Sequence, residues 1–402
     1  MDTSSRKENE VRIIIGADIV PTVSNQDFFE KAEMERLVDD NLFDVLNNAD
    51  YRIFNLEVPL TDKETPINKC GPNLIASAKS VEGLKQIGTN FLTLANNHIL
   101  DQGVQGLMST IEQLNYAGIA YGGVGMTPHE AVKPYIVDIK GVKAGIYCCA
   151  EHEFSIVNDK QAGANPFDPL ETPDHIVALK KQCDYVICLY HGGKEHYRYP
   201  SPNLQKVCRK LIEKGTDLVI CQHTHCIGCE EKYQNGTIVY GQGNFLFDHS
   251  ESEFWQTSLL VVIDIDKNSK NESSIKIDYL PLEKNKEAVR MSIGEERKKI
   301  LEQFRKRSTE IKEPGFVEKS YTAFALSMLD SYLGNFAAIK KERFLYKVVN
   351  KLSGYHYGKW VLRRKYGPDQ YTMMRNFVEC EAHRELLIDG LANSCAKNKN
   401  QQ

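Results

Sequence analysis

The chain has 402 residues, 42% of them hydrophobic, and a formal net charge of −4 at pH 7. A chain of this length and apolar content can bury a large core, which favours one large domain with an additional region. The weakly acidic charge gives no indication of nucleic-acid binding.

No run approaches the roughly 18 apolar residues that a transmembrane helix requires. Residues 1–11 are rich in Ser, Arg, Lys and Glu and contain no apolar segment, so no secretory signal is expected. The sequence therefore predicts a cytoplasmic protein, and peripheral contact with the inner membrane surface stays open as an alternative.

In chain order, short apolar runs recur, and each is followed by a glycine, a proline or a polar side chain. Such runs are typical of buried strands in an α/β protein. They are residues 11–15, 51–54, 91–95, 185–190, 216–220 and 237–240. In layered α/β folds, ligands bind beyond the carboxyl ends of the strands. One polar residue there could be a turn former or a helix cap, but Asp, Glu, Asn or His after every run indicates a site.

The run at residues 216–220 leads into Cys221-Gln222-His223-Thr224-His225. Two histidines one residue apart in an extended strand would project to the same side, because strand side chains alternate with a period of two. Buried imidazoles need partners, and neutral imidazole is the commonest metal ligand. An isolated pair of this kind could also be one structural and one exposed histidine. The polar residues after the other strands favour a metal site.

Together these segments resemble the CapA family, the poly-γ-glutamate or capsule-biosynthesis proteins of the calcineurin-like metallophosphoesterase superfamily. The resemblance covers roughly residues 11 to 250, with the motifs in the family's order. The matching segments are Gly16-Ala17-Asp18, Asn55-Leu56-Glu57, Ala95-Asn96-Asn97-His98 with Asp101 and Gly103, His191-Gly192-Gly193 with Glu195, His223-Thr224-His225, and residues 240–245.

The resemblance implies a four-layer αββα sandwich that holds two divalent metal ions, with Mn, Fe or Zn as candidates. By analogy, Asp18 and His225 would bind one metal ion. Asn97, His191 and His223 would bind the other, and Glu57 would bridge the two.

The resemblance also implies catalytic roles. His98 would stabilise the attacked group or protonate the leaving group, and Asp101 is a further catalytic candidate. Glu195 is expected to orient His191. Two metal ions at such a site lower the pKa of a shared water and hold both oxygens of an in-line displacement.

Several positions depart from the family's pattern. Val20 stands where the superfamily's first motif has a histidine, two residues after the aspartate. Glu57 replaces a more usual aspartate, and Gly192 replaces a frequent aromatic residue. The loss of a ligand near Asp18 predicts that this metal ion is held more weakly than the other.

Further residues are candidates for substrate contact. His196 and Arg198 lie in a loop bounded by prolines, where Arg198 could grip an anionic group. An exposed loop with incidental aromatic residues is the alternative. His152 follows another apolar run, and Asn244 lies in the last matching segment.

The chain has eleven cysteines, and several lie inside the predicted strands. The odd number and the absence of a secretory signal favour reduced thiols. Cys221, Cys226 and Cys229 have a spacing also found in iron–sulfur and zinc sites. A cluster would need a fourth ligand, and Cys221 fits better within the strand before His223.

The predicted domains are residues 11–284 for the sandwich, 285–392 for a C-terminal helical region and 393–402 for a disordered tail. Lys, Arg, Trp and Tyr alternate over residues 359–366, which could bind anionic lipid or polymer. A solvated helical face is the simpler interpretation of this segment.

The predicted function is that of a metal-dependent hydrolase in capsule or poly-γ-glutamate-type polymer biosynthesis, in which an activated water attacks a phosphoester or an amide. The expected partners are an anionic polymer or phosphoester substrate and the capsule-synthesis machinery. The alternative is a non-catalytic accessory factor that binds an anionic polymer or supports a polymer-synthesis assembly.

Overall fold

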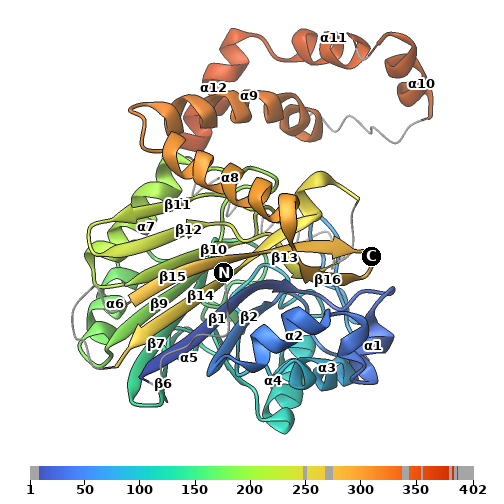
Figure 1. Cartoon of the computed structure of the whole chain (residues 1–402). Helices are drawn as coiled ribbons and strands as arrows, with labels where there is room; N and C mark the ends of the chain where they lie inside the picture. The colour runs from blue at the N-terminus through green and yellow to red at the C-terminus, as the bar shows by residue number, and fades with distance from the viewer. Residues whose placement is uncertain are drawn as a thin grey trace. The chain divides into compact units, whose positions relative to one another are not determined.

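Two β-sheets stacked face to face form the centre of the protein (Figure 1). The computed structural model describes residues 9–247, 251–267, 275–336, 344–354, 356–379, 383 and 387. The chain divides into two compact units, residues 1–321 and 322–402. The tail expected at residues 393–402 lies outside the described residues.

The larger sheet has the strand order β16-β15-β14-β1-β2-β3-β4, and β13 also pairs with β1. Its strands are β1 (Glu10–Ile19), β2 (Tyr51–Leu56), β3 (Phe91–Thr93), β4 (Ala120–Gly122), β13 (Asn244–Leu246), β14 (Thr257–Asp266), β15 (Ile275–Asn285) and β16 (Ala288–Met291). The strands from β1 to β4 are parallel, whereas β14, β15 and β16 continue the sheet with antiparallel pairing.

The smaller sheet has the order β11-β12-β10-β9-β7-β6. Its strands are β6 (Tyr135–Ile139), β7 (Val142–Ala150), β9 (Tyr185–His191), β10 (Leu218–Gln222), β11 (Glu230–Tyr233) and β12 (Gly236–Tyr240). The four inner strands are parallel, and the antiparallel strands β6 and β11 lie at the two edges. A short antiparallel pair is formed by β5 (Val124–Gly125) and β8 (Gly163–Ala164).

Three buried clusters define the layers. Alternate residues of β1, including Ile13 and Ile15, pack against the inner face of the smaller sheet, for example against Ile187. The outer face of the larger sheet packs against one group of helices, and the outer face of the smaller sheet against another. The first group is α1 (Gln26–Glu30), α2 (Asp40–Asn47), α3 (Val81–Gln86) and α4 (Gly103–Ala117), and the second is α6 (Thr172–Lys180) and α7 (Pro202–Glu213). The predicted four-layer αββα sandwich is therefore confirmed.

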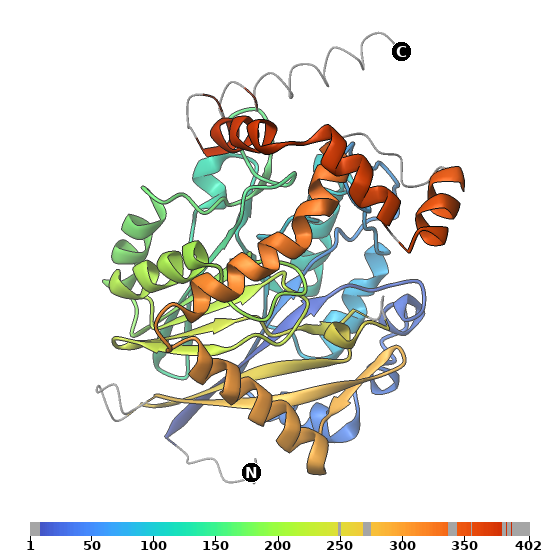
Figure 2. The same cartoon turned by 90° about the horizontal axis from the view of Figure 1, so that it is seen from above.

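Helix α8 (Gly294–Glu310) lies across β15 and β11 in the first unit (Figure 2). Its buried side chains Ile300 and Phe304 pack against Ile227 and Leu259. Strand β16 and helix α8 thus belong to the first unit although they follow residue 285. The domain boundary expected at residue 285 stays a prediction, because a compact unit is defined by contacts and not by independent folding.

The described part of the second unit is helical. Helix α9 (Phe316–Phe336) leads into it, followed by α10 (Phe344–Leu352), α11 (His356–Lys365) and α12 (Pro368–Glu379). On α11, Arg364 stacks on Trp360 with 4.7 Å between the guanidinium carbon and the ring centroid. Within the described residues, no helix is long and apolar enough to cross a membrane.

Replacing Ile15, which is fully buried between the two sheets, should destabilise the protein. We expect Ile15→Ala to lower the free energy of unfolding by about 2–5 kcal/mol, because the lost methylenes leave a cavity. The half-exposed Ile136 on the edge strand β6 provides the control, and Ile136→Ala should cost less than about 1 kcal/mol. Urea unfolding measures the free energy of unfolding of both variants. Equal losses of this free energy would contradict the placement of Ile15 in the core.

Candidate metal centre

The carboxyl ends of strands from both sheets converge on one cluster of polar side chains. The larger sheet supplies Asp18 near the end of β1, Glu57 directly after β2, and Asn97 and His98 after β3, whereas the smaller sheet supplies His191 at the end of β9 and His223 and His225 after β10. Among the predicted metal ligands, the larger sheet thus contributes two carboxylates and one amide, and the smaller sheet contributes three imidazoles. All six predicted metal ligands are among these residues.

Asp18 is fully buried and lies between two asparagines of the neighbouring strands, because its register partners are Asn55 on β2 and Asn244 on β13. Asn55 Nδ2 donates a hydrogen bond of 2.8 Å to Asp18 Oδ1. Asp18 Oδ2 has no hydrogen-bond partner among the described residues, and His225 Nδ1 lies 3.6 Å from it. One carboxylate oxygen is therefore left for another positive group.

The pairing of β1 shifts register between Ile15 and Asp18, which frees backbone carbonyls just before the aspartate. Gln222 Nε2 donates to the Gly16 carbonyl at 3.2 Å, and Gln242 Nε2 donates to the Ile15 carbonyl at 2.9 Å. Gly16 has no room for a side chain, since a Cβ there would lie 2.3 Å from the Phe54 ring. These contacts hold the strand end that carries Asp18.

Glu57 occupies the middle of the cluster. It is fully buried, and neither of its carboxylate oxygens has a hydrogen-bond partner among the described residues. His191 Nε2 lies 3.2 Å from Glu57 Oε1 and 3.0 Å from Asn97 Oδ1. Asn55 Nδ2 lies 3.4 Å from the other ring nitrogen of His191. The position between both sheets agrees with the bridging role predicted for Glu57.

His223 and His225 reach the cluster through a turn rather than through strand alternation. Strand β10 ends at Gln222, and both histidines have positive φ angles, 92° and 52°. The expectation that a period of two directs them to one side is therefore wrong, because neither residue is in an extended strand. Their rings are 6.0 Å apart, and His223 faces His191 at 4.9 Å.

The charges of the cluster shift its pKa values. Burial raises the pKa of Asp18, and the neighbouring Glu57 carboxylate raises it further. Burial would also raise the pKa of Glu57, but the positive charges of His191 and His225 outweigh burial and hold it below its usual range. Burial and the charge of His191 lower the pKa of His223. Burial would lower the pKa of His225 too, yet Glu57 and Asp18 raise it to about 9.

The buried polar atoms of this cluster that lack hydrogen-bond partners are of the kinds that coordinate metal ions. Both Glu57 oxygens, Asp18 Oδ2 and His223 Nδ1 are buried without hydrogen-bond partners among the described residues. Buried polar atoms are normally paired, and a buried charge is tolerated when it is paired or coordinates a metal. Two groups of donors have ligand atoms within 4.8 Å of one another: Glu57, His191 and His223 form one, and Asp18, Glu57 and His225 form the other. The residues therefore fit a divalent metal centre, and Glu57 belongs to both groups of donors.

Each group has three carboxylate or imidazole donors, and an asparagine adjoins each of them. Asn97 Oδ1 lies 3.0 Å from His191 Nε2 in the first group, and Asn244 Oδ1 lies 2.9 Å from His225 Nδ1 in the second. Near Asp18, the departure Val20 is a buried apolar residue, and Asn55 already occupies Asp18 Oδ1. The weaker binding expected for the ion at Asp18 stays a prediction.

His98 and Asp101 form a hydrogen-bonded pair beside the cluster. His98 Nδ1 lies 2.6 Å from Asp101 Oδ2, which also accepts from the Leu74 amide at 2.6 Å. Lys69 Nζ forms an ion pair with Asp101 and lies 3.2 Å from His98 Nδ1. The Lys69 side chain is 3% exposed, and that of His98 is 13% exposed. The imidazole is thus held through Nδ1 while part of its ring stays accessible.

An aromatic wall covers His225. Trp255, in the short helix η3 (Glu253–Trp255), stacks on His225 with 4.8 Å between ring centroids. Trp255 Nε1 donates to His196 Nε2 at 2.9 Å. Arg198 lies over the Phe254 ring at 4.8 Å. His196 and Arg198 therefore lie beside the metal ligands, and Asn244 Oδ1 contacts His225 Nδ1 at 2.9 Å.

Two other predicted residues lie apart from the cluster. Glu195 is exposed, whereas His191 is buried and directs its ring nitrogens to Asn55, Asn97 and Glu57. Within the described residues, no contact joins Glu195 to His191, so its orienting role stays a prediction. His152 is exposed in the turn after β7.

The cysteines are free thiols where the structure describes them. Cys221, Cys226 and Cys229 are fully buried, and burial raises the pKa of Cys226 to about 11. Cys221 lies in β10 with its sulfur 3.6 Å from Cys208 of α7. Cys221 therefore behaves as a packed strand residue, as expected.

Sequence reasoning did not assign a role to Asn55, Lys69 or Trp255. Asn55 belongs to a matching segment, so its position after an apolar run was a usable signal. Lys69 lies in a loop and Trp255 in the short helix η3, and no apolar run precedes either residue. Only the tertiary structure brings these two residues to the site.

The chain is similar in sequence to bacterial capsule-synthesis proteins. Residues 13–249 match the family described as "Bacterial capsule synthesis protein PGA_cap". The chain is 30% identical over 213 residues to the capsule biosynthesis protein CapA of Bacillus anthracis. This alignment covers 50% of this chain and 52% of that protein. It is 28% identical over 239 residues to the PGA biosynthesis protein CapA of Bacillus subtilis, covering 56% and 60%. The chain thus spans about half the length of these relatives.

A solved structure described as a novel phosphatase from Mycoplasma pneumoniae is similar at a TM-score of 0.42 and 15% identity. The alignment covers 68% of this chain and 93% of that protein.

The shared carboxylate gives a direct test of the metal centre. Adding Mn²⁺ should raise the melting temperature of the wild type, because a ligand at 100 times its Kd stabilises by about 2.7 kcal/mol. Glu57→Gln should lose most of this shift, since Glu57 belongs to both donor groups. Glu195→Gln, which removes an exposed carboxylate, should keep the shift. An unchanged shift in Glu57→Gln would argue against metal binding here.

Proposed function

Because the chain belongs to the bacterial capsule synthesis protein family PGA_cap, we propose that it is a metal-dependent hydrolase acting in capsule or poly-γ-glutamate-type polymer biosynthesis. The observation that carries this proposal is the group of buried, unpartnered donor atoms around Glu57. Capsule and poly-γ-glutamate synthesis are the roles of the similar CapA proteins by name.

One divalent ion would be held by Asn97, His191 and His223. The other would be held by Asp18 and His225, and Glu57 would contact both ions. Mixed carboxylate, amide and imidazole donors suit Mn, Fe or Zn. Bound ions of this kind supply a water of lowered pKa and polarise the bond to be cleaved. Aromatic side chains such as Trp255 cover one side of the donors and limit the access of solvent there.

His98 is the residue that can move a proton. Its Nδ1 is held by Asp101 at 2.6 Å, which orients the ring and leaves Nε2 as the nitrogen that can serve a leaving group. Lys69 pairs with Asp101 and helps to hold its carboxylate beside His98. Arg198 is 21% exposed at its side chain and can contact an anionic part of the substrate.

The family to which the chain belongs and the positive charge of Arg198 support an anionic substrate. We propose an anionic polymer or a phosphoester, with cleavage of a phosphoester or an amide bond. The partners would be components of the capsule-synthesis machinery. The cytoplasmic location and the peripheral membrane contact stay predictions.

Removing the proposed acid should separate catalysis from metal binding. We expect His98→Ala to lower turnover by about 10²- to 10⁴-fold, the usual contribution of general acid–base catalysis. Its metal content should equal that of the wild type, because His98 is not among the donors. Turnover is followed with phosphodiester substrates and γ-glutamyl polymers, with His129→Ala, which changes an exposed histidine outside the site, as the control. Full activity in His98→Ala would rule out the assigned role.

A non-catalytic accessory factor is the second candidate function. The observation that favours it is Val20, a buried apolar residue where the superfamily's first motif has a histidine. Such a protein would keep one firmly held ion and use the fold to bind polymer or support an assembly.

Metal stoichiometry distinguishes the two candidates. For the hydrolase, elemental analysis after manganese or iron supplementation should find about two ions per chain. His225→Ala and His191→Ala should each lose one ion, because they belong to different donor groups. A single ion that only His191→Ala removes would favour the accessory factor instead.

A further inference from the structure

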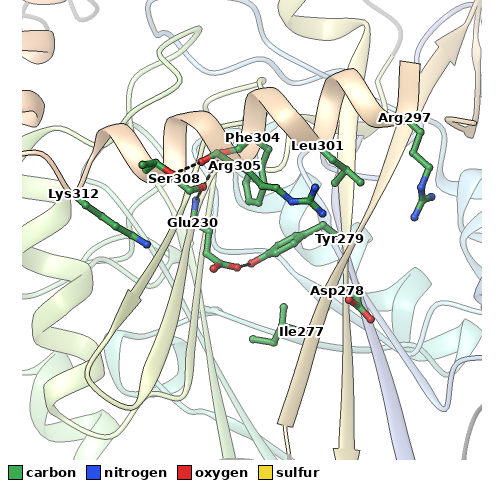
Figure 3. A pocket seen from close by; sticks show the side chains of 11 residues that line it. Glu230, Ile277, Asp278, Tyr279, Arg297, Leu301, Phe304, Arg305, Ser308 and Lys312 are labelled. Atoms are coloured by element: carbon green, nitrogen blue, oxygen red, sulfur yellow. Dashed lines mark hydrogen bonds between the residues drawn. The ribbon is translucent and has the colours of Figure 1, made fainter. Parts of the chain in front are cut away.

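A second concave site lies beneath helix α8, on β15 and the start of β11. It has a volume of about 530 Å³. Leu301 and Phe304 of α8 and Ile277 and Tyr279 of β15 supply its apolar lining (Figure 3). Arg297, Arg305 and Lys312 also line it. None of these residues belongs to the candidate metal centre.

The basic residues of α8 and Lys312 after it fall into two sets, apart from Arg307, which is buried and donates to the Gly228 carbonyl. In the outer set, which does not line the pocket, Lys298 pairs with Glu295 at 2.5 Å, Lys299 with Glu296 at 3.4 Å and Lys306 with Glu310 at 3.8 Å. The three cations that line the pocket make no ion pair or side-chain hydrogen bond with any described residue. The helix therefore neutralises its outer cations and leaves the pocket cations available.

The acidic residues of the pocket are already engaged. Glu230 accepts a hydrogen bond from the Tyr279 hydroxyl and lies 3.9 Å from Lys232. Asp278 pairs with Lys276. These two carboxylates reduce the positive potential at the pocket floor. They would therefore repel a ligand with several negative charges close together more strongly than a ligand whose single charges are spaced apart.

The three free cations are spread along the pocket. Figure 3 shows Arg297 and Lys312 at opposite ends of the pocket, with Arg305 between them. At about 1.5 Å per helical residue, the distance from Arg297 to Lys312 is roughly 20 Å along the axis. A single small anion cannot contact both ends. A chain of about seven extended residues, at about 3.3 Å each, can do so.

We propose that the groove beneath α8 is a binding site for an extended polycarboxylate chain, with Arg297, Arg305 and Lys312 pairing with successive carboxylates. Arginine suits this role because its planar guanidinium can bind a carboxylate through two hydrogen bonds. The cations border a hollow rather than a convex face, which favours a chain over the flat surface of an anionic membrane. The proposal does not depend on the hydrolytic activity proposed above.

The test compares two variants of equal charge. One is the triple variant R297Q/R305Q/K312Q, which removes the pocket cations, and the other is K298Q/K299Q/K306Q, which removes the paired outer cations. Both lose three positive charges from the same region, and glutamine is a good helix former. Circular dichroism and thermal unfolding verify that both variants fold. The probe is fluorescein-labelled decaglutamate, followed by anisotropy in metal-free buffer at low salt, so that the metal centre does not contribute.

We expect the pocket variant to weaken decaglutamate binding about tenfold or more, since exposed ion pairs contribute roughly 0.2–1 kcal/mol each. The outer variant should change the Kd by less than about threefold, because its lysines are already paired. Diglutamate should compete poorly, as it cannot span the groove.

Equal weakening in both variants would overturn the proposal, because binding would then reflect overall charge. Binding of phosphatidylglycerol vesicles without binding of decaglutamate would assign the cations to a membrane and would also overturn it. The proposal would also be overturned if a polyphosphate of ten units bound more tightly than decaglutamate and its binding depended on the same three cations.

Discussion

The electrostatic attraction between the buried Glu57 carboxylate and the histidines of the facing sheet is the interaction on which the site depends. An isolated buried carboxylate costs several kcal/mol, so Glu57 is tolerated only beside positive groups. Here the charges of His191 and His225 hold its pKa low despite complete burial. Its two unpartnered oxygens face donors from both sheets. One side chain thus joins the two halves of the cluster.

The fold explains why such a cluster can exist. Parallel strands in each sheet place their carboxyl ends at one edge, and stacking the sheets brings the two edges together. The larger sheet presents Asp18 and Glu57, and the smaller sheet presents His191 and the turn that carries His223 and His225. Carboxylate and imidazole donors therefore come from opposite sides of the core. Misalignment of either sheet would separate them.

Helix α8 connects the two sites described above. Arg307 Nε donates to the Gly228 carbonyl at 2.7 Å, and Ser308 Oγ accepts from the Glu230 amide at 2.8 Å. Gly228 lies three residues after His225, so the helix holds the segment that follows this ligand. Ser308 and other residues of the same helix also line the basic groove. A polymer bound there would lie on the element that supports the loop after His225.

The sequence by itself determined the strands, and its resemblance to the CapA family implied the layer arrangement and the candidate ligands. The apolar runs at residues 185–190 and 216–220 correspond closely to β9 (Tyr185–His191) and β10 (Leu218–Gln222), because a buried strand needs apolar side chains on both faces. The polar residues after these runs were recognisable because strand ends are local features. The motifs also placed Glu57 between the two donor groups.

The tertiary structure alone decided how these residues meet. His223 and His225 converge through positive φ angles that the local pattern did not indicate. Lys69 reaches Asp101 from a loop, and Trp255 reaches His225 from a segment 30 residues further along the chain. The free cations of α8 could not be told from its paired ones in the sequence, since pairing depends on which helix face packs against β15. Long-range packing, which no local periodicity encodes, is the physical reason for all three.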